Sequence, residues 1–217
     1  MCGRYVRKSD KQRLVEAFHL RTVPDSVALA PNYNVAPTTF QPVIRADKET
    51  GERELVMMRW GMVPHFAKSL ADFKGFSTIN AKSEAVTTKP MWRGPFQRRR
   101  CLVPADGFYE WVRPGSRPEP FAFGGIWDAW KEPDGGLLQS FAIITTDPNE
   151  LTATVHNRMP VMVKPSDYDR WLTPDDPERP PVDLLRPYDA GEMTAYPVDP
   201  RVGNVHNKEP SLCEKPG

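Results

Sequence analysis

The chain has 217 residues, of which 39% are hydrophobic and 26% are charged, and these proportions are ordinary for one soluble globular domain. Lys and Arg number 29 against 28 Asp and Glu, so the formal net charge of +1 excludes a polycation that grips nucleic acid over its whole surface. A local basic groove is compatible with this balance, because the distribution of charge matters more than its total.

The three cysteines, Cys2, Cys101 and Cys213, show no CxxC pairing, which argues against a disulfide framework and against a thiolate metal site. The sequence does not start with a basic region followed by an apolar stretch, and it has no run of about eighteen apolar residues. We therefore expect a cytoplasmic protein with reduced thiols, no membrane partner, and no metal or other cofactor.

The predicted elements are short, because 24 prolines interrupt the chain. Periodicity predicts a capped amphipathic helix over 9–18, an extended segment over 31–38 and a hairpin of strands 40–45 and 53–59. A helix is expected to open at 80–85, and a short helix is expected over 166–172. The remaining strand candidates are 99–104, 108–112, 121–130, 138–146 and 161–164.

This order of elements has no regular βαβ rhythm and contains no repeat. We therefore predict one α+β domain over 1–217, with a largely antiparallel, barrel-like sheet core and short peripheral helices. Residues 173–187 are rich in Pro and Asp, and they are predicted to be a loop and not a second domain.

Cys2 is the first candidate for chemistry, because a small residue after Met1 usually permits removal of the methionine. The exposed α-amine would have a pKa well below that of a lysine, so a useful fraction would be neutral and nucleophilic. An amine and a thiol on adjacent carbons trap an aldehyde: the amine forms an imine, and the thiol closes on the imine carbon to give a thiazolidine. The alternative is an unreactive cysteine at a frayed terminus.

Two further positions could supply acid–base chemistry. Glu110 lies between aromatic residues, and enclosure by them would raise the pKa of its carboxyl group, although strand alternation would turn it outward instead. His156 could transfer protons near neutral pH, or it could be purely structural. The spacing of the four histidines matches no metal-binding motif.

For nucleic acid, the one dense basic run is residues 98–100, and phosphate contacts from such a run would be salt-sensitive. Trp60 and Phe66 are candidates for stacking on bases or for wedging into a duplex end. The alternatives are a solvated charged strand and core aromatic residues.

The set and order of motifs in this chain resemble the SRAP (SOS response-associated peptidase) family of abasic-site processing proteins, and the resemblance covers essentially the whole chain. The motifs read MCGRY at 1–5, NYNVAPT at 32–38, WGMVP at 60–64, INAKSE at 79–84, RCLVPADGFYEW at 100–111, TTD at 145–147 and VHNRMP at 155–160, with VGNV at 202–205 followed by Asn207.

The resemblance implies a compact α+β fold with a barrel-like sheet, and a role in DNA repair within the SOS response to DNA damage. It implies that Cys2, freed of Met1, forms a covalent thiazolidine with the ring-opened abasic deoxyribose of single-stranded DNA. Asn80 would orient the reacting groups, Glu110 would act as general acid and base, and His156 would assist opening of the sugar ring. The residues implied to contact DNA are Arg4, Asn34, Pro37, Phe66, Lys82 and Thr145.

Within that set, Pro37 and Phe66 match the region that wedges at a junction of single-stranded and double-stranded DNA. The family also implies lyase-like activity with self-reversal of the crosslink, and a peptidase activity that removes Met1. By the same resemblance we expect a monomer that associates with the nucleoid when it is bound to DNA.

Three positions depart from the family pattern. Lys82 stands where Arg is common. Its ammonium would contact a phosphate as a point charge, whereas a guanidinium would make a bidentate contact. Asn157 replaces a frequent Asp, and Phe66 replaces a frequent Trp. Two other functions stay open from the residues alone: an N-terminal-nucleophile cysteine peptidase or amidohydrolase, and a non-covalent single-stranded DNA-binding module.

Overall fold

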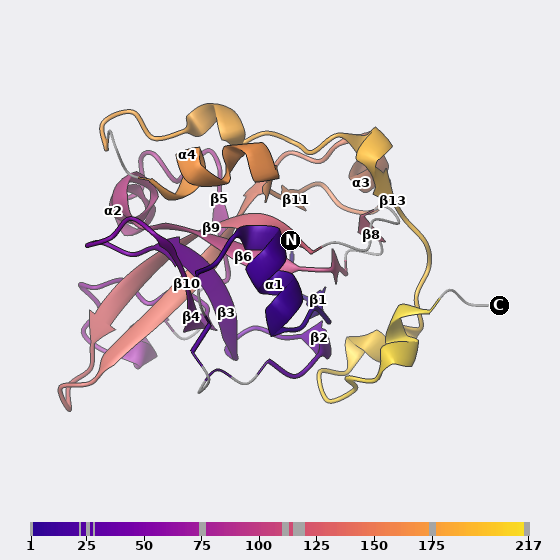
Figure 1. Ribbon diagram of the computed structural model, residues 1–217, viewed down its shortest axis with the longest axis horizontal. Helices are drawn as coiled ribbons and strands as arrows, with labels where there is room; N and C mark the ends of the chain where they lie inside the picture. The colour runs from indigo at the N-terminus through magenta and orange to yellow at the C-terminus, as the bar shows by residue number, and fades with distance from the viewer. Residues whose placement is uncertain are drawn as a thin grey trace.

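The computed structural model describes residues 2–21, 23–24, 27, 29–73, 77–109, 113–114, 120–173 and 177–214. Its core is a closed ring of five strands (Figure 1). They are β3 (Phe40–Ala46), β4 (Arg53–Trp60), β6 (Arg100–Ala105), β9 (Phe121–Lys131) and β10 (Leu137–Thr146).

Closure of the ring follows from the pairings of the strands. β10 pairs with β4, β4 with β3, β3 with β6, β6 with β9, and β9 returns to β10. All of these pairs are antiparallel except β4 with β10, which is parallel. The predicted α+β class and the largely antiparallel, barrel-like core are therefore confirmed.

Alternation along the strands divides the buried residues into two groups. One group lies inside the ring and includes Phe123 and Trp127 of β9 with Phe141 of β10. The other group faces outward and includes Ile126 of β9 and Ile144 of β10. The barrel is thus a packed core with a second apolar layer outside it.

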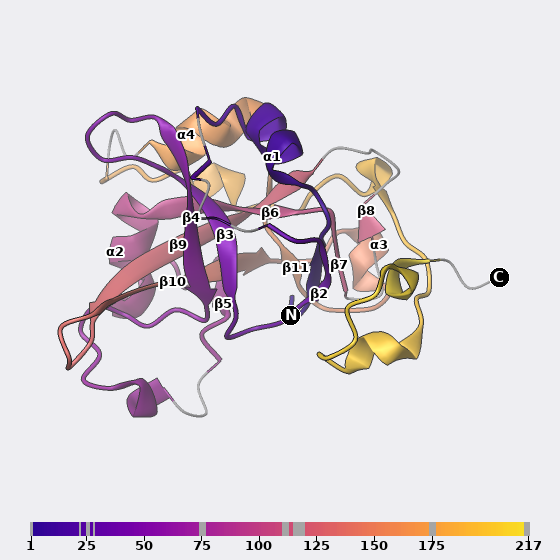
Figure 2. The ribbon, with the colours of Figure 1, turned by 60° about the horizontal axis from the view of Figure 1, so that its bottom comes forward.

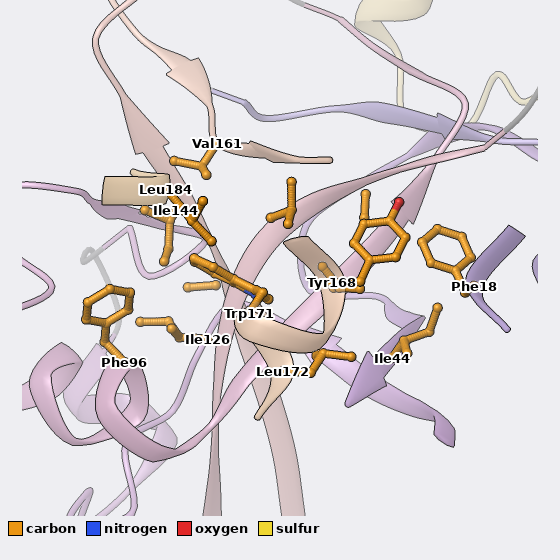
Figure 3. Close-up of a cluster of buried hydrophobic side chains, with 14 of the residues drawn as sticks. Phe18, Ile44, Phe96, Ile126, Ile144, Val161, Tyr168, Trp171, Leu172 and Leu184 are labelled. Carbon is orange, nitrogen blue, oxygen red and sulfur yellow. The ribbon is translucent and has the colours of Figure 1, made fainter. Parts of the chain in front are cut away.

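Three helices cover this outer layer: α1 (Lys11–Phe18), α2 (Pro90–Arg98) and α4 (Tyr168–Leu172). Figure 3 shows Trp171 of α4 near Ile126 and Phe96, with Tyr168 next to Phe18. The rings of Tyr168 and Phe18 are stacked with their centroids 5.3 Å apart. Burial of these large side chains holds the short helices, which would be marginal alone.

One end of the barrel is covered by a three-stranded antiparallel sheet with the order β2-β1-β7. Its strands are β1 (Tyr5–Arg7), β2 (Asn32–Val35) and β7 (Gly107–Phe108). Tyr5 packs edge-on against Trp60 and Phe123, with ring centroids 5.3 and 5.8 Å apart. Phe108 makes a similar contact with Phe123 at 5.8 Å. The N-terminal strand therefore closes the barrel at this end.

Short elements extend the main sheet and connect it. β5 (Asn80–Lys82) runs parallel to β10, β11 (Met159–Pro160) pairs antiparallel with β10, and β12 (Met162–Val163) pairs antiparallel with β9. β8 (Arg113–Pro114) pairs with β13 (Met193–Thr194), and α3 (Glu150–Ala153) follows β10. The 3₁₀ helices are η1 (Leu70–Phe73), η2 (Pro165–Asp167), η3 (Val182–Leu184), η4 (Ala190–Glu192), η5 (Pro200–Gly203) and η6 (Pro210–Cys213).

Several predicted elements are confirmed in detail. The hairpin of β3 and β4 pairs Phe40 with Arg59 through to Ala46 with Arg53. The first helix begins at Lys11, and its cap is Asp10, whose side chain accepts a hydrogen bond from the N–H of Arg13 at 2.9 Å. The strands of 121–130 and 138–146 are β9 and β10, each one residue longer than expected.

One prediction before the second helix was wrong, and the second helix itself was not predicted. Residues 80–82 form strand β5 and not a helix, because β4 ends at Trp60 and leaves the edge of β10 beyond Phe141 open for another strand. Helix α2 was not predicted, because its prolines were interpreted as turn residues. Pro90 occupies the first turn of the helix, where the backbone N–H has no intrahelical partner, so its absence costs nothing. Pro95 removes one intrahelical hydrogen bond, and burial of the Phe96 side chain offsets that loss.

Candidate functional site

Cys2 lies at the end of the barrel that β1 covers. Its side chain is 0% exposed and belongs to the interior cluster with Tyr5, Phe108, Ile143 and Met159. These members of the cluster come from β1, β7, β10 and β11, so Cys2 belongs to the same apolar core as four strands. Cys2 is therefore embedded in the fold, and the frayed terminus considered from the sequence is not what the structure contains.

Asn80 holds Cys2 from the side of β5. Its Nδ2 donates a hydrogen bond to the carbonyl oxygen of Cys2 at 3.0 Å, and the residue is 8% exposed. Its Oδ1 is buried and has no hydrogen-bond partner among the described residues. An unsatisfied buried amide oxygen lowers the stability of the folded state. A hydrogen-bond donor placed next to Oδ1 would remove that cost.

Lys82 of β5 and Thr145 of β10 form the pair two residues beyond Asn80 and Ile143 on the same two parallel strands. The register pairs Asn80 with Ile143 and Lys82 with Thr145. Lys82 is exposed, whereas Thr145 is fully buried and its Oγ1 has no hydrogen-bond partner in the described part of the chain. The structure thus brings a cation and two incompletely bonded polar atoms to one edge of the barrel.

Glu110 lies outside the described residues, but the residue before it is well fixed. The N–H of Tyr109 donates to the carbonyl of Arg4 at 2.9 Å. The hydroxyl of Tyr109 donates to the carbonyl of Tyr33 at 2.7 Å. The residue before Glu110 is therefore hydrogen-bonded to Arg4, which is two residues after Cys2.

His156 follows α3 and is half-buried. Its backbone N–H donates to Thr152 at 2.9 Å, and its Nδ1 accepts a hydrogen bond from the N–H of Arg158 at 2.9 Å. An accepting Nδ1 leaves the proton of the neutral imidazole on Nε2. Met159, three residues later, belongs to the same interior cluster as Cys2, so one short segment carries both His156 and a residue of that cluster.

Arg158 joins three of the motifs and was missed from the sequence. Its guanidinium binds both carboxylate oxygens of Glu84 at 2.6 and 2.7 Å, Asp147 at 3.0 Å and the carbonyl of Thr145 at 2.6 Å. This ion-pair cluster ties the turn after β5 to the end of β10 and to the loop of His156. The available signal was the placement of opposite charges in three motifs that the fold brings together.

The cluster has a consequence for stability against pH. The Arg158 guanidinium lowers the pKa of the Glu84 carboxyl to about 2, against the partial desolvation that opposes it. Because the folded-state pKa is depressed, the stabilisation is present above pH 4.5 and is lost as the pH falls through about 2. We expect Glu84→Gln to lower the urea midpoint at pH 6 and to have little effect near pH 2. An equal loss at both pH values would contradict this assignment.

The other positions implied to contact DNA fall into two groups. Arg4 and Asn34 bind each other, with Nη1 of Arg4 donating to Oδ1 of Asn34 at 2.9 Å. Phe66 is 54% exposed and packs edge-on against His65, with ring centroids 5.3 Å apart. Pro37 is half-buried and precedes a turn in which the N–H of Thr38 donates to the carbonyl of Trp60 at 2.8 Å.

For the basic run and for Trp60, the structure decides between the alternatives that the sequence left open. Arg100 is 4% exposed and donates to four backbone carbonyls, those of Phe96, Gln97, Trp171 and Thr173, at 2.6–2.9 Å. Arg99 pairs with Asp128 at 3.0 Å. Trp60 is fully buried, and its Nε1 donates to the carbonyl of Ile79 at 2.9 Å. Arg99 and Arg100 thus tie elements together, Arg98 stays exposed, and Trp60 is a core aromatic residue that offers no face to a base.

The site contains one other thiol inside the barrel, that of Cys101. Burial raises the pKa of Cys101 above its ordinary value, which keeps the thiol protonated and unreactive. Across the described residues, His, Cys, Asp and Glu form no group of three placed to bind a metal ion. No helix in the described part is long and apolar enough to cross a membrane.

Comparison with known proteins is consistent with this arrangement. The family model described as SOS response associated peptidase (SRAP) matches residues 1–205. The abasic site processing protein YoqW of Bacillus subtilis is 35% identical over 226 residues, which cover 99% of both chains. The abasic site processing protein HMCES of Gallus gallus is 31% identical and matches 83% of this chain and 65% of its own.

Solved structures agree on the fold. A protein from Bacteroides thetaiotaomicron superimposes with a TM-score of 0.87 at 24% identity, over 99% of this chain and 100% of its own. The identity is low, so this likeness concerns the fold alone. The family match, by contrast, extends over nearly the whole sequence. The chain therefore belongs to the SOS response-associated peptidase (SRAP) family.

Proposed function

We propose that this chain processes abasic sites in single-stranded DNA by forming a covalent thiazolidine through Cys2 after Met1 has been removed. With Met1 in place, the nitrogen of Cys2 belongs to a peptide bond and cannot act as an amine nucleophile. The proposed substrate is the ring-opened deoxyribose of an abasic site, which presents an aldehyde. The product is a DNA–protein crosslink that shields the lesion during repair.

The proposed reaction has two bond-forming steps. The α-amine of Cys2 adds to the aldehyde carbon, and the carbinolamine loses its hydroxyl as water to give an imine. The Cys2 sulfur then adds to the imine carbon, and the thiol proton moves to the imine nitrogen. One C–N bond and one C–S bond form, and one water molecule leaves. An acid near the carbinolamine would protonate the departing hydroxyl, which is the role proposed for Glu110. His156 is proposed to assist ring opening, with Nε2–H as its donor.

The observation that supports this proposal most directly is the contact between Asn80 and Cys2. A side-chain amide that binds the carbonyl of residue 2 at 3.0 Å fixes the direction of the N-terminus. Removal of Met1 would create an ammonium or amine beside an amide whose oxygen has no partner among the described residues. An amine donor in that place would satisfy the oxygen and hold the nucleophile in one orientation.

Several residues are proposed to contact DNA around this point. Lys82 is exposed two residues after Asn80 and can bind a phosphate as a point charge. Phe66 presents an exposed ring that can stack on a base or wedge at a junction, and Pro37 would support that wedge. The names of the relatives, which are abasic site processing proteins, support the same substrate.

A denaturing gel tests the proposal. The protein is incubated with single-stranded DNA that carries one abasic site, and with the same strand intact as control. We expect a shifted band with the abasic strand alone, and an intact mass equal to protein without Met1 plus DNA minus one water. The absence of any shifted band under these conditions would refute the proposal.

The same experiment separates the alternatives. Peptide cleavage that depends on Cys2, with no shifted band, would indicate an N-terminal-nucleophile peptidase. Retention of both strands in a native gel, with no band in the denaturing gel, would indicate a non-covalent binding module.

A further inference from the structure

The last described part of the chain, residues 200–214, lies against the N-terminal sheet β2-β1-β7, whose strand β1 begins three residues after Cys2. We call it the C-terminal strap; it contains the 3₁₀ helices η5 and η6. Figures 1 and 2 both show this yellow segment beside β2, far along the sequence from the strand it approaches. Its core contact is small, since Val202 and Leu212 are its buried apolar side chains. Polar side chains in and beside the N-terminal sheet, and Tyr196, supply further contacts.

Arg4 is the first of these side chains. Its Nη1 donates to the carbonyl of Val202 at 2.7 Å and to Oδ1 of Asn34 at 2.9 Å, and its Nη2 donates to the carbonyl of Gly203 at 2.9 Å. Both N–H groups of Nη1 are thereby used. A guanidinium suits this task because its planar fork meets two successive carbonyls, which an ammonium cannot match.

Asn34 is the second, and its side chain is 0% exposed. Its Nδ2 lies 3.1 Å from the carbonyl of Val202, 3.0 Å from that of Asn204 and 2.9 Å from that of Asn207. Its Oδ1 accepts from Arg4. The amide is saturated by these partners, so a phosphate contact would require the strap to leave.

Tyr109 and Tyr196 hold the far end of the strap. The hydroxyl of Tyr109 lies 3.0 Å from Sγ of Cys213, and the hydroxyl of Tyr196 donates to the carbonyl of Cys213 at 2.9 Å. Tyr109 is also the residue before Glu110 and is bonded through its backbone to Arg4. The strap thus contacts the two strands that lead to Cys2 and to Glu110.

We propose that the C-terminal strap is a positioning element for the reaction, and that Arg4 and Asn34 are positioning residues that dock it. This inference rests on the proposed function. The strap ties the residues next to β1, β2 and the end of β7 into one unit, so the segments that carry Cys2 and Tyr109 keep a fixed relation to each other. The family resemblance implies that Arg4 and Asn34 contact DNA; their hydrogen bonds in the structure favour the docking role.

Arg4→Lys separates the two roles, because lysine keeps the positive charge but loses the fork. If Arg4 docks the strap, hydrogen exchange within 200–214 rises in the absence of DNA. The rate constant of crosslinking at saturating DNA then falls by about tenfold or more, because small misplacements of reacting groups cost that much. The apparent Kd for single-stranded DNA and the slope of its salt dependence stay close to wild type. Arg13→Lys, on the exposed face of α1, is the matched control and should change none of these values.

Three results would overturn the proposal. The first is wild-type exchange in the strap. The second is faster exchange with an unchanged rate at saturating DNA, which would make the strap purely structural. The third is weaker DNA binding with an unchanged rate at saturation, which would make Arg4 a phosphate contact.

Tyr196→Phe provides a second, milder test in case Arg4→Lys does not fold, as judged by a cooperative thermal melt. It removes the hydroxyl that binds the carbonyl of Cys213 and lies outside the proposed catalytic and DNA-binding residues. We expect faster exchange within 210–214 and a smaller fall in the crosslinking rate; an unchanged rate despite faster exchange overturns the proposal. If the wild-type protein forms no adduct, the proposed function fails and the positioning role falls with it, while exchange data still report whether the strap docks.

Discussion

Replacement of Cys2 by alanine is expected to abolish the stable adduct with abasic DNA and to leave non-covalent DNA binding within about twofold of wild type. Alanine keeps the α-amine after removal of Met1, so an imine can still form, but no sulfur is present to close the ring. The imine hydrolyses on denaturation, whereas a thiazolidine persists. A denaturing gel of the Cys2→Ala reaction should therefore show no shifted band, and a band should return when borohydride is added to reduce the imine.

Cys101→Ala is the matched control for this prediction. Cys101 is also fully buried within the barrel, but burial raises the pKa of its thiol and it is not adjacent to an α-amine. The control should give the wild-type yield of adduct. A heat-stable adduct from Cys2→Ala, or its loss in Cys101→Ala under conditions where that variant is folded, would contradict the assignment of Cys2.

Replacement of Trp171 by alanine is expected to lower the free energy of unfolding by about 3–5 kcal/mol, the range for truncation of a large buried aromatic side chain. Trp171 is 0% exposed, and its Nε1 donates to the carbonyl of Cys101 at 2.9 Å. A Cβ on Gly124 would lie 2.9 Å from Cζ2 of Trp171, so the indole packs directly on the backbone of β9. Truncation leaves a cavity there and a carbonyl without its donor.

Urea denaturation followed by far-UV circular dichroism measures this effect. Leu137→Ala is the control, because Leu137 is 65% exposed at the start of β10, and its loss should change stability by less than about 0.5 kcal/mol. Trp171→Phe should fall between the two, since it keeps most of the volume but not the N–H. A loss below about 1 kcal/mol in Trp171→Ala would show that α4 does not stabilise the barrel.

The strands of the barrel could be predicted from the sequence because their signals are local. The β3–β4 hairpin has a short apolar run on each side of a polar turn, and β9 and β10 are longer, largely apolar runs. Strand β5 could not be predicted in this way, because its three residues are extended only through pairing with the open edge of β10. Helix α2 was hidden by Pro90 and Pro95, whose cost is offset by tertiary packing that a local pattern does not contain.

The candidate site was predictable in part. Motif order identified Cys2 and Asn80, and the structure places the two in direct contact. It also places Tyr109, just before Glu110, in contact with Arg4. The ion-pair cluster of Arg158 depends on residues 74 and 11 positions away along the chain, which single-residue chemistry cannot pair. For the same reason the strap was not foreseen: Arg4 meets Val202 across 198 positions.

Closure of the five-strand ring also sets an order of events during synthesis. The ring is complete only when β10, which ends at Thr146, has paired with both β4 and β9. Before that point the N-terminal strand has no barrel end to cover, and a nascent chain with such non-local pairing folds slowly. Afterwards Cys2 is 0% exposed. Under the proposed function, an enzyme that must contact Cys2 to remove Met1 therefore has its best access before the barrel closes, so the rate of barrel closure would limit how much protein begins with a free cysteine.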